Sequence, residues 1–241
     1  MFKNKISMPV VASSGGGGGY KITKLTVTEN GLYDSEFEAY KPVYVSVPPV
    51  QGDTLKALLD DTKSANNLFY KYKGTNVDDI LYYSTTANVT DMTMMFSNCT
   101  NLITIPLIDT SNVTNMSQMF AICRSLTTIP QLDTHKVTSM YYMFRNCSSL
   151  TSIPELDTSK VEDMQFMFDG CTSLTSIGMY GFTCSINITP TALEHDAIVA
   201  LFNQAGETDR NGETITMGSA KLALLSDEEK AIATNKGWRL A

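Results

Sequence analysis

The sequence is poor in the residues that most often carry chemistry. Its 241 residues include only two histidines, His135 and His195. No Cys or His pair has the close spacing of a zinc site. The glycine run at 15–19 lacks the Gly-Lys-Ser/Thr ending of a phosphate-binding loop. We therefore expect no catalytic residues, no metal, no cofactor and no enzymatic activity.

Charge and long apolar runs are scarce as well. Charged residues make up 18% of the chain, the net charge is −7, and Lys and Arg are not clustered, which disfavours a nucleic-acid surface. No apolar run approaches the ~18 residues of a membrane span. The first twelve residues resemble a signal peptide only faintly, because Ser7 and Pro9 interrupt a short apolar part. We expect neither nucleic-acid binding nor membrane insertion.

What the sequence does have is a 24-residue unit that occurs four times and keeps eight columns. Val, Met, Met, Phe, Cys, Leu and Ile recur, and Pro closes three copies where the fourth has Gly178. Apolar residues from Val113 to Phe120 have helical spacing, and 126–129 has the composition of a strand. Units of this length bury their apolar faces against neighbours. The sequence predicts an α/β repeat solenoid of leucine-rich-repeat type, with parallel strands plus short helices.

Four of the five cysteines occupy one column, and the fifth is Cys184. Neighbouring strands lie ~4.8 Å apart, which is within the Cα range for a disulfide. Side chains in one column point in parallel, however, and this favours a ladder of reduced, buried thiols.

Five segments follow from these patterns. They are an extended Gly-rich anchoring arm (1–19), a small β module (20–50), a degenerate N-terminal cap repeat (51–84), four repeats (85–177) and an α+β C-terminal cap (178–241). The β module contains the turn signal Asn30-Gly31. In the cap repeat, Leu68-Phe69 stands where Met95-Phe96 stands in the next copy.

The two ends carry further local signals. Met8, Pro9, Val10 and Val11 are apolar enough for the arm to anchor on a partner. In the C-terminal cap, Thr189-Pro190 opens a predicted helix that Gly206 ends, and residues 226–229 form a capping box for a last helix.

Columns that vary among the copies mark positions that stacking does not dictate. The third copy places His135, Tyr141, Tyr142 and Arg145 in such columns. Tyr and Arg are typical hot-spot residues, so these four are the candidate partner-binding residues. The alternative is an ordinary wetted surface.

An aspartate recurs at Asp109, Asp133 and Asp157, each followed by Thr. This pattern is typical of turn capping. The alternative, a calcium ladder, lacks the Gly-rich nonapeptide that such sites need.

The repeat DTSNVTNMSQMFAICRSLTTIPQL and its neighbours resemble the BspA-type leucine-rich repeat, found in bacterial surface proteins and in phage and prophage structural proteins. The resemblance covers 85–177 strongly and 53–84 weakly. The flanking stretches KLTVTENGLYDSEFEAYKPVYVSVP and LLSDEEKAIATNKGWRLA resemble segments beside such repeats in phage tail and fibre proteins. The family implies a right-handed solenoid used for adhesion or recognition.

The resemblance leads to a functional expectation. We expect a non-enzymatic virion protein, a tail or head fibre, anchored to other virion proteins by its arm. Its repeats would recognise a host-surface protein or glycan, and the chain would form a homo-oligomer, a trimer or dimer. The alternative is a bacterial cell-surface adhesin, placed on the cell surface instead of the virion.

Overall fold

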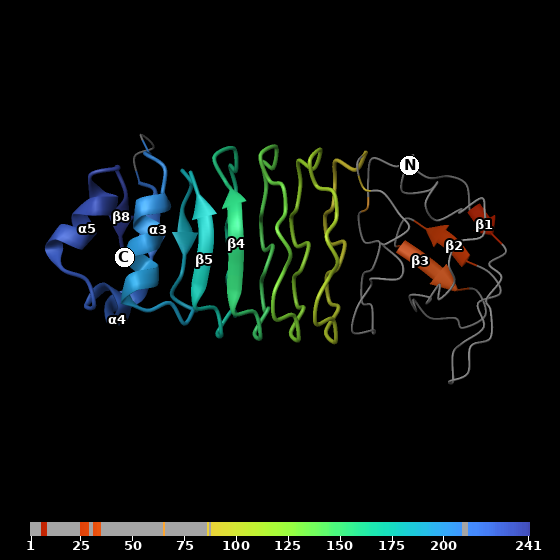
Figure 1. Ribbon diagram of the computed structural model, residues 1–241, viewed down its shortest axis with the longest axis horizontal. Helices are drawn as coiled ribbons and strands as arrows, with labels where there is room; N and C mark the ends of the chain where they lie inside the picture. The colour runs from red at the N-terminus through yellow and green to blue at the C-terminus, as the bar shows by residue number, and fades with distance from the viewer. Residues whose placement is uncertain are drawn as a thin grey trace.

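The computed structural model describes residues 6–8, 25–28, 31–34, 65, 86, 88–208 and 212–241. From residue 88 onward, successive 24-residue copies lie side by side in one row, and the C-terminal segment covers the last copy (Figure 1). Each copy makes one circuit around a shared interior.

Three short strands near the N-terminus form an antiparallel sheet in the order β1-β2-β3. These are β1 (Ile6–Met8), β2 (Leu25–Thr28) and β3 (Gly31–Asp34). Gly31 of the predicted turn is itself paired with Thr28. Because β1 pairs with β2, this part of the predicted arm shares a sheet with the predicted β module. The rest of both segments, including Pro9, Val10 and Val11, lies outside the described residues.

Parallel pairing joins the copies along two walls. On one wall β4 (Ser152–Asp157) pairs in parallel with β5 (Ser176–Tyr180). The two copies before β4 continue this wall with a single inter-copy backbone bond each, such as Thr127 N–H to the Ile103 carbonyl (3.1 Å). On the other wall, parallel bridges link Asn115 to its equivalents in the copies before and after it.

The short helix predicted within each copy is wrong. Residues 117–122 form consecutive tight turns, in which the N–H of Cys123 donates to the carbonyl of Phe120 (3.1 Å). Gln118 and Ile122 have φ of 57° and 65°, a left-handed conformation that a right-handed helix excludes. In a series of tight turns with a left-handed residue at every fourth position, the side chains that point inward recur with the spacing of a helix. The apolar pattern therefore does not separate it from a helix.

Backbone groups in these turns are satisfied by an alternation. The N–H groups of Met116, Gln118, Phe120 and Ile122 donate to carbonyls of the next copy, at 2.6–3.0 Å. The N–H groups between them close turns within the copy. Since buried backbone groups must be paired, this alternation fixes each copy against the next without a continuous strand.

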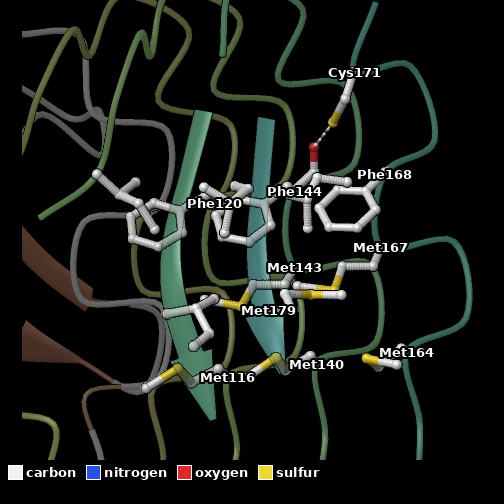
Figure 2. Close-up of a cluster of buried hydrophobic side chains, with 14 of the residues drawn as sticks. Met116, Phe120, Met140, Met143, Phe144, Met164, Met167, Phe168, Cys171 and Met179 are labelled. Carbon is white, nitrogen blue, oxygen red and sulfur yellow. Dashed lines mark hydrogen bonds between the residues drawn. The ribbon is translucent and has the colours of Figure 1, made fainter. Parts of the chain in front are cut away.

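The interior holds the constant columns in register (Figure 2). The rings of Phe96 and Phe120 are stacked with centroids 5.5 Å apart, and the ladder continues at 5.6 Å to Phe144 and 6.1 Å to Phe168. Parallel-displaced rings at these distances attract beyond their area burial. Burying each such side chain contributes about 1.5–3 kcal/mol.

The cysteine column lies beside the phenylalanines, and all five cysteines are buried and form no disulfide among the described residues. The Sγ–H of Cys147 donates to the Phe120 carbonyl (3.0 Å). The Sγ–H of Cys171 donates to the Phe144 carbonyl (3.0 Å), as Figure 2 shows. Burial raises the pKa of Cys171 to about 12 and that of Cys147 well above its ordinary value. The thiols are therefore protonated and weakly nucleophilic at neutral pH.

One described residue of the predicted cap repeat follows the same ladder. Ala65 is buried, and its N–H donates to the Asp91 carbonyl (2.8 Å). In the next copy the N–H of Met92 donates to the carbonyl of Asn115, the equivalent of Asp91. Ala65 thus stands where Met92 stands, which is the alignment in which Leu68-Phe69 matches Met95-Phe96.

The C-terminal segment leaves the repeat and has a parallel sheet in the order β6-β7-β8, with three helices beside it. Its elements are β6 (Ile186–Asn187), α3 (His195–Gln204), β7 (Thr214–Thr216), α4 (Gly218–Leu222), α5 (Asp227–Thr234) and β8 (Arg239–Leu240). Helix α3 begins five residues after Pro190, so the predicted start is wrong. The N–H groups of Thr191 and Ala192 instead bond the carbonyls of Ile188 and Leu174.

Long side chains hold this segment together. The predicted capping box of α5 is confirmed, since Ser226 Oγ accepts from the N–H of Glu229 and the Glu229 carboxylate accepts from the N–H of Ser226. Lys236 Nζ donates to the carbonyls of Phe202, Asn203 and Ala205 at 2.8–3.0 Å. These carbonyls end α3, where a cation also complements the helix dipole.

Candidate recognition surfaces on the repeat stack

The left-handed turn positions are what point the variable columns outward. One column holds Met94, Gln118, Tyr142 and Phe166, all with φ of 55–57°. The other holds Asn98, Ile122, Asn146 and Gly170. Asn and Gly adopt this conformation readily, whereas for a bulky residue it is an outlier. Aromatic residues in the first column are therefore not a requirement of the turn, since Met and Gln fill it in the first two copies.

Three aromatic rings meet on this surface. The rings of Tyr142 and Phe166 are stacked, with centroids 4.9 Å apart and an interplanar angle of 14°. Tyr141 stands edge-on to both, at 4.2 Å from Tyr142 and 6.4 Å from Phe166. The side chain of Phe166 remains 49% exposed. The third and fourth copies together thus build an aromatic corner that faces solvent.

Arg145 completes this corner. Its guanidinium carbon lies 4.9 Å from the centroid of the Tyr142 ring, within cation–π range. Its Nε lies 3.3 Å from Asp169 Oδ2 in the next copy. The hydrogen bond with Tyr142 raises the pKa of Tyr141, so that phenol stays protonated at neutral pH. We call Tyr141, Tyr142, Arg145, Phe166 and Asp169 the aromatic patch.

His135, the fourth predicted site residue, belongs to a different surface. Its ring Nδ1 bonds Asp133 Oδ1, and its own N–H donates to the same oxygen at 3.2 Å. It lines a groove together with residues 107–111, 131–134, 155, 157 and 180, which we call the repeat groove. The structure therefore brings Tyr141, Tyr142 and Arg145 together but places His135 among other neighbours.

The carboxylates of the repeat groove are held by turns, as the aspartate pattern predicts. Asp109 Oδ1 accepts from the N–H (2.9 Å) and Oγ–H (2.7 Å) of Ser111, and Asp157 bonds Ser159 in the same way. Hydrogen bonds from Ser111 lower the pKa of Asp109, and those from His135 lower the pKa of Asp133. Both carboxylates are thus charged at neutral pH.

Asp169 of the aromatic patch and the existence of the repeat groove were not predicted from the sequence. Asp169 has a partner only because it lies one copy beyond Arg145, a relation that the 24-residue spacing does supply. The groove itself had no sequence signal, because concavity arises from how the strand wall meets the aspartate turns. Among the residues that the structure describes, no group of His, Cys, Asp or Glu side chains could hold a metal ion.

Within the described part of the chain, no helix is both long enough and apolar enough to cross a membrane. Of the predicted anchoring residues, the structure describes only the backbone of Met8, at the end of β1, where it pairs with Leu25. The anchoring role expected of the Met8 side chain and of residues 9–11 therefore stays a prediction.

Comparison with known proteins gives one match. Residues 63–180 match the family model described as "Mycoplasma protein of unknown function, DUF285". The match begins two residues before Ala65 and ends at Tyr180, the last residue of β5. This is consistent with a BspA-type repeat protein. No curated protein and no solved structure matches the chain.

Proposed function

We propose that this protein is a non-enzymatic recognition protein whose repeats form a leucine-rich-repeat-type solenoid of the α/β class. The observation that carries the proposal is the division of labour within each copy. Constant columns fill the interior, and variable columns project from left-handed turns, where two copies assemble the aromatic patch. A fixed framework with a free outer surface is how repeat proteins present binding sites.

The chemistry of the groove supports binding over catalysis. Glycoside hydrolysis, the reaction that paired carboxylates in a groove most readily suggest, needs one carboxyl group with a raised pKa as general acid. Asp109 and Asp133 have lowered pKa values because their turns donate hydrogen bonds to them. Neither carboxyl is suited to give up a proton near neutral pH.

More specifically, we propose that the protein is a phage virion accessory protein, a tail or head fibre. The resemblance of both flanking segments to phage fibre proteins supports it. Residues 1–19 would attach the chain to other virion proteins, with Met8, Pro9, Val10 and Val11 as the anchor, and the repeats would face a host-surface protein or glycan. A homo-oligomer, a trimer or dimer, would multiply weak contacts.

The second candidate is a bacterial cell-surface adhesin. The match of residues 63–180 to a BspA-like repeat family favours it, because that likeness extends to surface repeat proteins and does not itself imply a phage. In this case the same aromatic patch would bind a partner while the chain stays on the cell.

One experiment separates the two. Purified virions from the source strain are analysed by mass spectrometry for the full-length chain and for a chain lacking residues 1–19. The virion proposal predicts that the full chain co-purifies with particles and the deletion does not. If the chain stays on cells and particles lack it, the virion proposal is wrong and the adhesin stands.

The deletion needs a matched variant, because it also removes β1, which pairs with β2. The double substitution Val10→Asp, Val11→Asp leaves β1 in place and introduces two charges into the proposed anchor. It should also fail to join particles, while its circular dichroism spectrum stays that of the native chain.

A further inference from the structure

The repeat groove has the dimensions and lining of a binding site and shares no residue with the aromatic patch. It encloses about 710 Å³ between the strand wall and the aspartate turns. Residues of all four copies line it, from Leu107 of the first to Asp157 of the fourth, with Tyr180 beyond them. We propose that the repeat groove binds a linear, uncharged glycan whose chain runs along the stack. This adds a second site to the function proposed above and names its ligand class.

The repeat of the groove matches the repeat of such a chain. Equivalent side chains recur once per copy, and parallel-paired strands of neighbouring copies, such as β4 and β5, lie ~4.8 Å apart. This spacing is comparable to the length of one pyranose ring in an extended polysaccharide. Asp109, Asp133 and Asp157 therefore offer one carboxylate to each successive sugar unit.

The hydrogen-bonding groups of the groove call for a ligand that donates. In each aspartate the turn bonds go to Oδ1, as at Asp109, Asp133 and Asp157, so the other oxygen of each carboxylate takes no part in the turn. Carboxylates only accept hydrogen bonds. A ligand rich in hydroxyl groups supplies the donors that such a row of acceptors requires.

The groove also has an apolar group at each end. Leu107 is 75% exposed and Tyr180 is 45% exposed, and both line the groove. Sugar rings present C–H faces that pack on aliphatic and aromatic side chains, while their hydroxyl edges bond polar groups. A central row of acceptors between two apolar contacts thus suits a short stretch of sugar chain.

Charge excludes acidic chains and does not require a basic one. The charged carboxylates of Asp109 and Asp133 repel phosphate- or carboxylate-bearing polymers. The nearest lysine in sequence, Lys136, is not part of the groove lining; its positive charge helps to lower the pKa of Asp133, and its Nζ donates to Asn112 Oδ1 at 2.7 Å. Oligolysine is the alternative ligand that the carboxylates of the groove leave open, and it is therefore one arm of the test.

The size of the apolar surface favours a glycan over a protein. A stable protein interface buries about 800 Å² on each partner around a core of large apolar side chains. In the described part of the chain, only Leu107 and Tyr180 of the groove belong to the exposed large hydrophobic residues. The remaining lining is mostly Asp, Glu, Gln, Ser and Thr.

The test uses the full chain on an array of neutral linear oligosaccharides, with acidic oligosaccharides and oligolysine on the same array. The proposal predicts binding to at least one neutral oligosaccharide. Leu107→Ala and Tyr180→Ala should each weaken it by about tenfold, because each removes one apolar contact of the site. Leu224→Ala is the matched control, since Leu224 is also exposed but lies outside the groove. Its affinity should stay native.

Three outcomes would overturn the proposal. They are binding to no neutral oligosaccharide, binding only to acidic oligosaccharides or to oligolysine, and binding that Tyr180→Ala leaves unchanged. Thermal unfolding of each variant establishes that the fold is intact. Association with particles or cells is measured on the same variants. If the chain binds no oligosaccharide on the array but still associates with particles or cells, the glycan site is refuted and the proposed recognition function is not.

Discussion

The repeats (88–177) and the C-terminal segment (178–241) satisfy their backbones by different means. In the repeats, N–H groups such as those of Gln118 and Tyr142 donate to carbonyls of the next copy. In the C-terminal segment, side chains do much of this work, as Lys236 does for three carbonyls at the end of α3. Lys221 Nζ likewise donates to the carbonyls of Thr189 and Thr191.

This difference determines whether an outward side chain contributes to the fold or is free for another role. In the repeats the backbone bonds do not depend on which side chain projects outward, so Tyr142 and Phe166 can replace Met94 and Gln118 without changing the ladder. In the C-terminal segment an equally polar residue such as Lys236 is part of the fold. Under the proposed function, variation in the first region is available for recognition, whereas variation at a residue such as Lys236 in the second is expected to cost stability.

The largest expected effect comes from breaking the aromatic ladder. Phe144 is fully buried and its ring is stacked between those of Phe120 and Phe168. We expect Phe144→Ala to lower the free energy of unfolding by about 4 kcal/mol, because it leaves a cavity that neighbouring copies cannot fill. Urea denaturation measures it. Phe166→Ala removes only a solvent-exposed stack on Tyr142 and should cost at most about 1.5 kcal/mol; equal losses would contradict the account.

The next effect tests the C-terminal segment. Lys236→Met keeps the aliphatic stem but removes the ammonium group that three carbonyls accept from. We expect a loss of about 2 kcal/mol, the range for hydrogen bonds to a charged group. Lys230→Met is the control, because the partner of Lys230 is the exposed carboxylate of Asp227 at 3.5 Å; it should cost less than about 0.5 kcal/mol. A loss for Lys236→Met as small as that of this control would show that the hydrogen bonds of Lys236 do not stabilise the C-terminal segment.

The cysteine column predicts a dependence of stability on pH. The folded thiol of Cys171 has a raised pKa of about 12, against 9.0 ordinarily. Its contribution is fully present below pH 9.0 and is lost as pH rises toward 12, because only the unfolded thiol ionises in that window. The slope is at most about 1.4 kcal/mol per pH unit.

Urea denaturation at several alkaline pH values compares the native chain with Cys171→Ala. The variant lacks the titrating group, so its stability should fall less steeply between pH 9.0 and 12. The remaining cysteines are present in both chains, and burial, the largest cause of the raised pKa of Cys147, is the same in both although Cys171 also contributes to it. Parallel curves would mean that the buried thiol of Cys171 is not coupled to folding.

The smallest effect distinguishes two equivalent threonines. Thr110 Oγ1 donates to the Asp133 carbonyl at 2.8 Å, whereas Thr134 Oγ1 is buried and has no partner among the described residues. We expect Thr110→Val to cost about 1 kcal/mol and Thr134→Val to be neutral or stabilising, since the second removes an unsatisfied hydroxyl. The paired denaturation midpoints decide it, and a reversed order would be evidence against this hydrogen-bond assignment.

Much of the interior could be predicted from the sequence. The columns of Val, Met, Phe and Cys are buried as expected because a residue that recurs in every copy is one that stacking requires. Local rules also held at the Asp109 turn and at the capping box of Ser226. These features depend on a few adjacent residues, so a single sequence contains them.

The rest depended on geometry that the sequence does not display. Helical spacing in the Met-Phe run concealed consecutive turns, although Asn98, Asn146 and Gly170 in one column indicated left-handed residues. His135 and Tyr141 are close in sequence, but the turn between them directs them to separate surfaces. Two outward side chains of one copy can therefore be close in sequence and still lie on different surfaces, because the backbone changes direction at each turn.

The most direct test of the account is binding of the purified full chain to cells of the host. The native chain is compared with the double variant Tyr142→Ala, Phe166→Ala and with Leu224→Ala, an exposed apolar control in the C-terminal segment. The account predicts that the double variant stays folded and binds at least about tenfold more weakly, while the control binds as the native chain does. Equal binding by all three chains would contradict the claim that the variable columns of the repeats carry recognition.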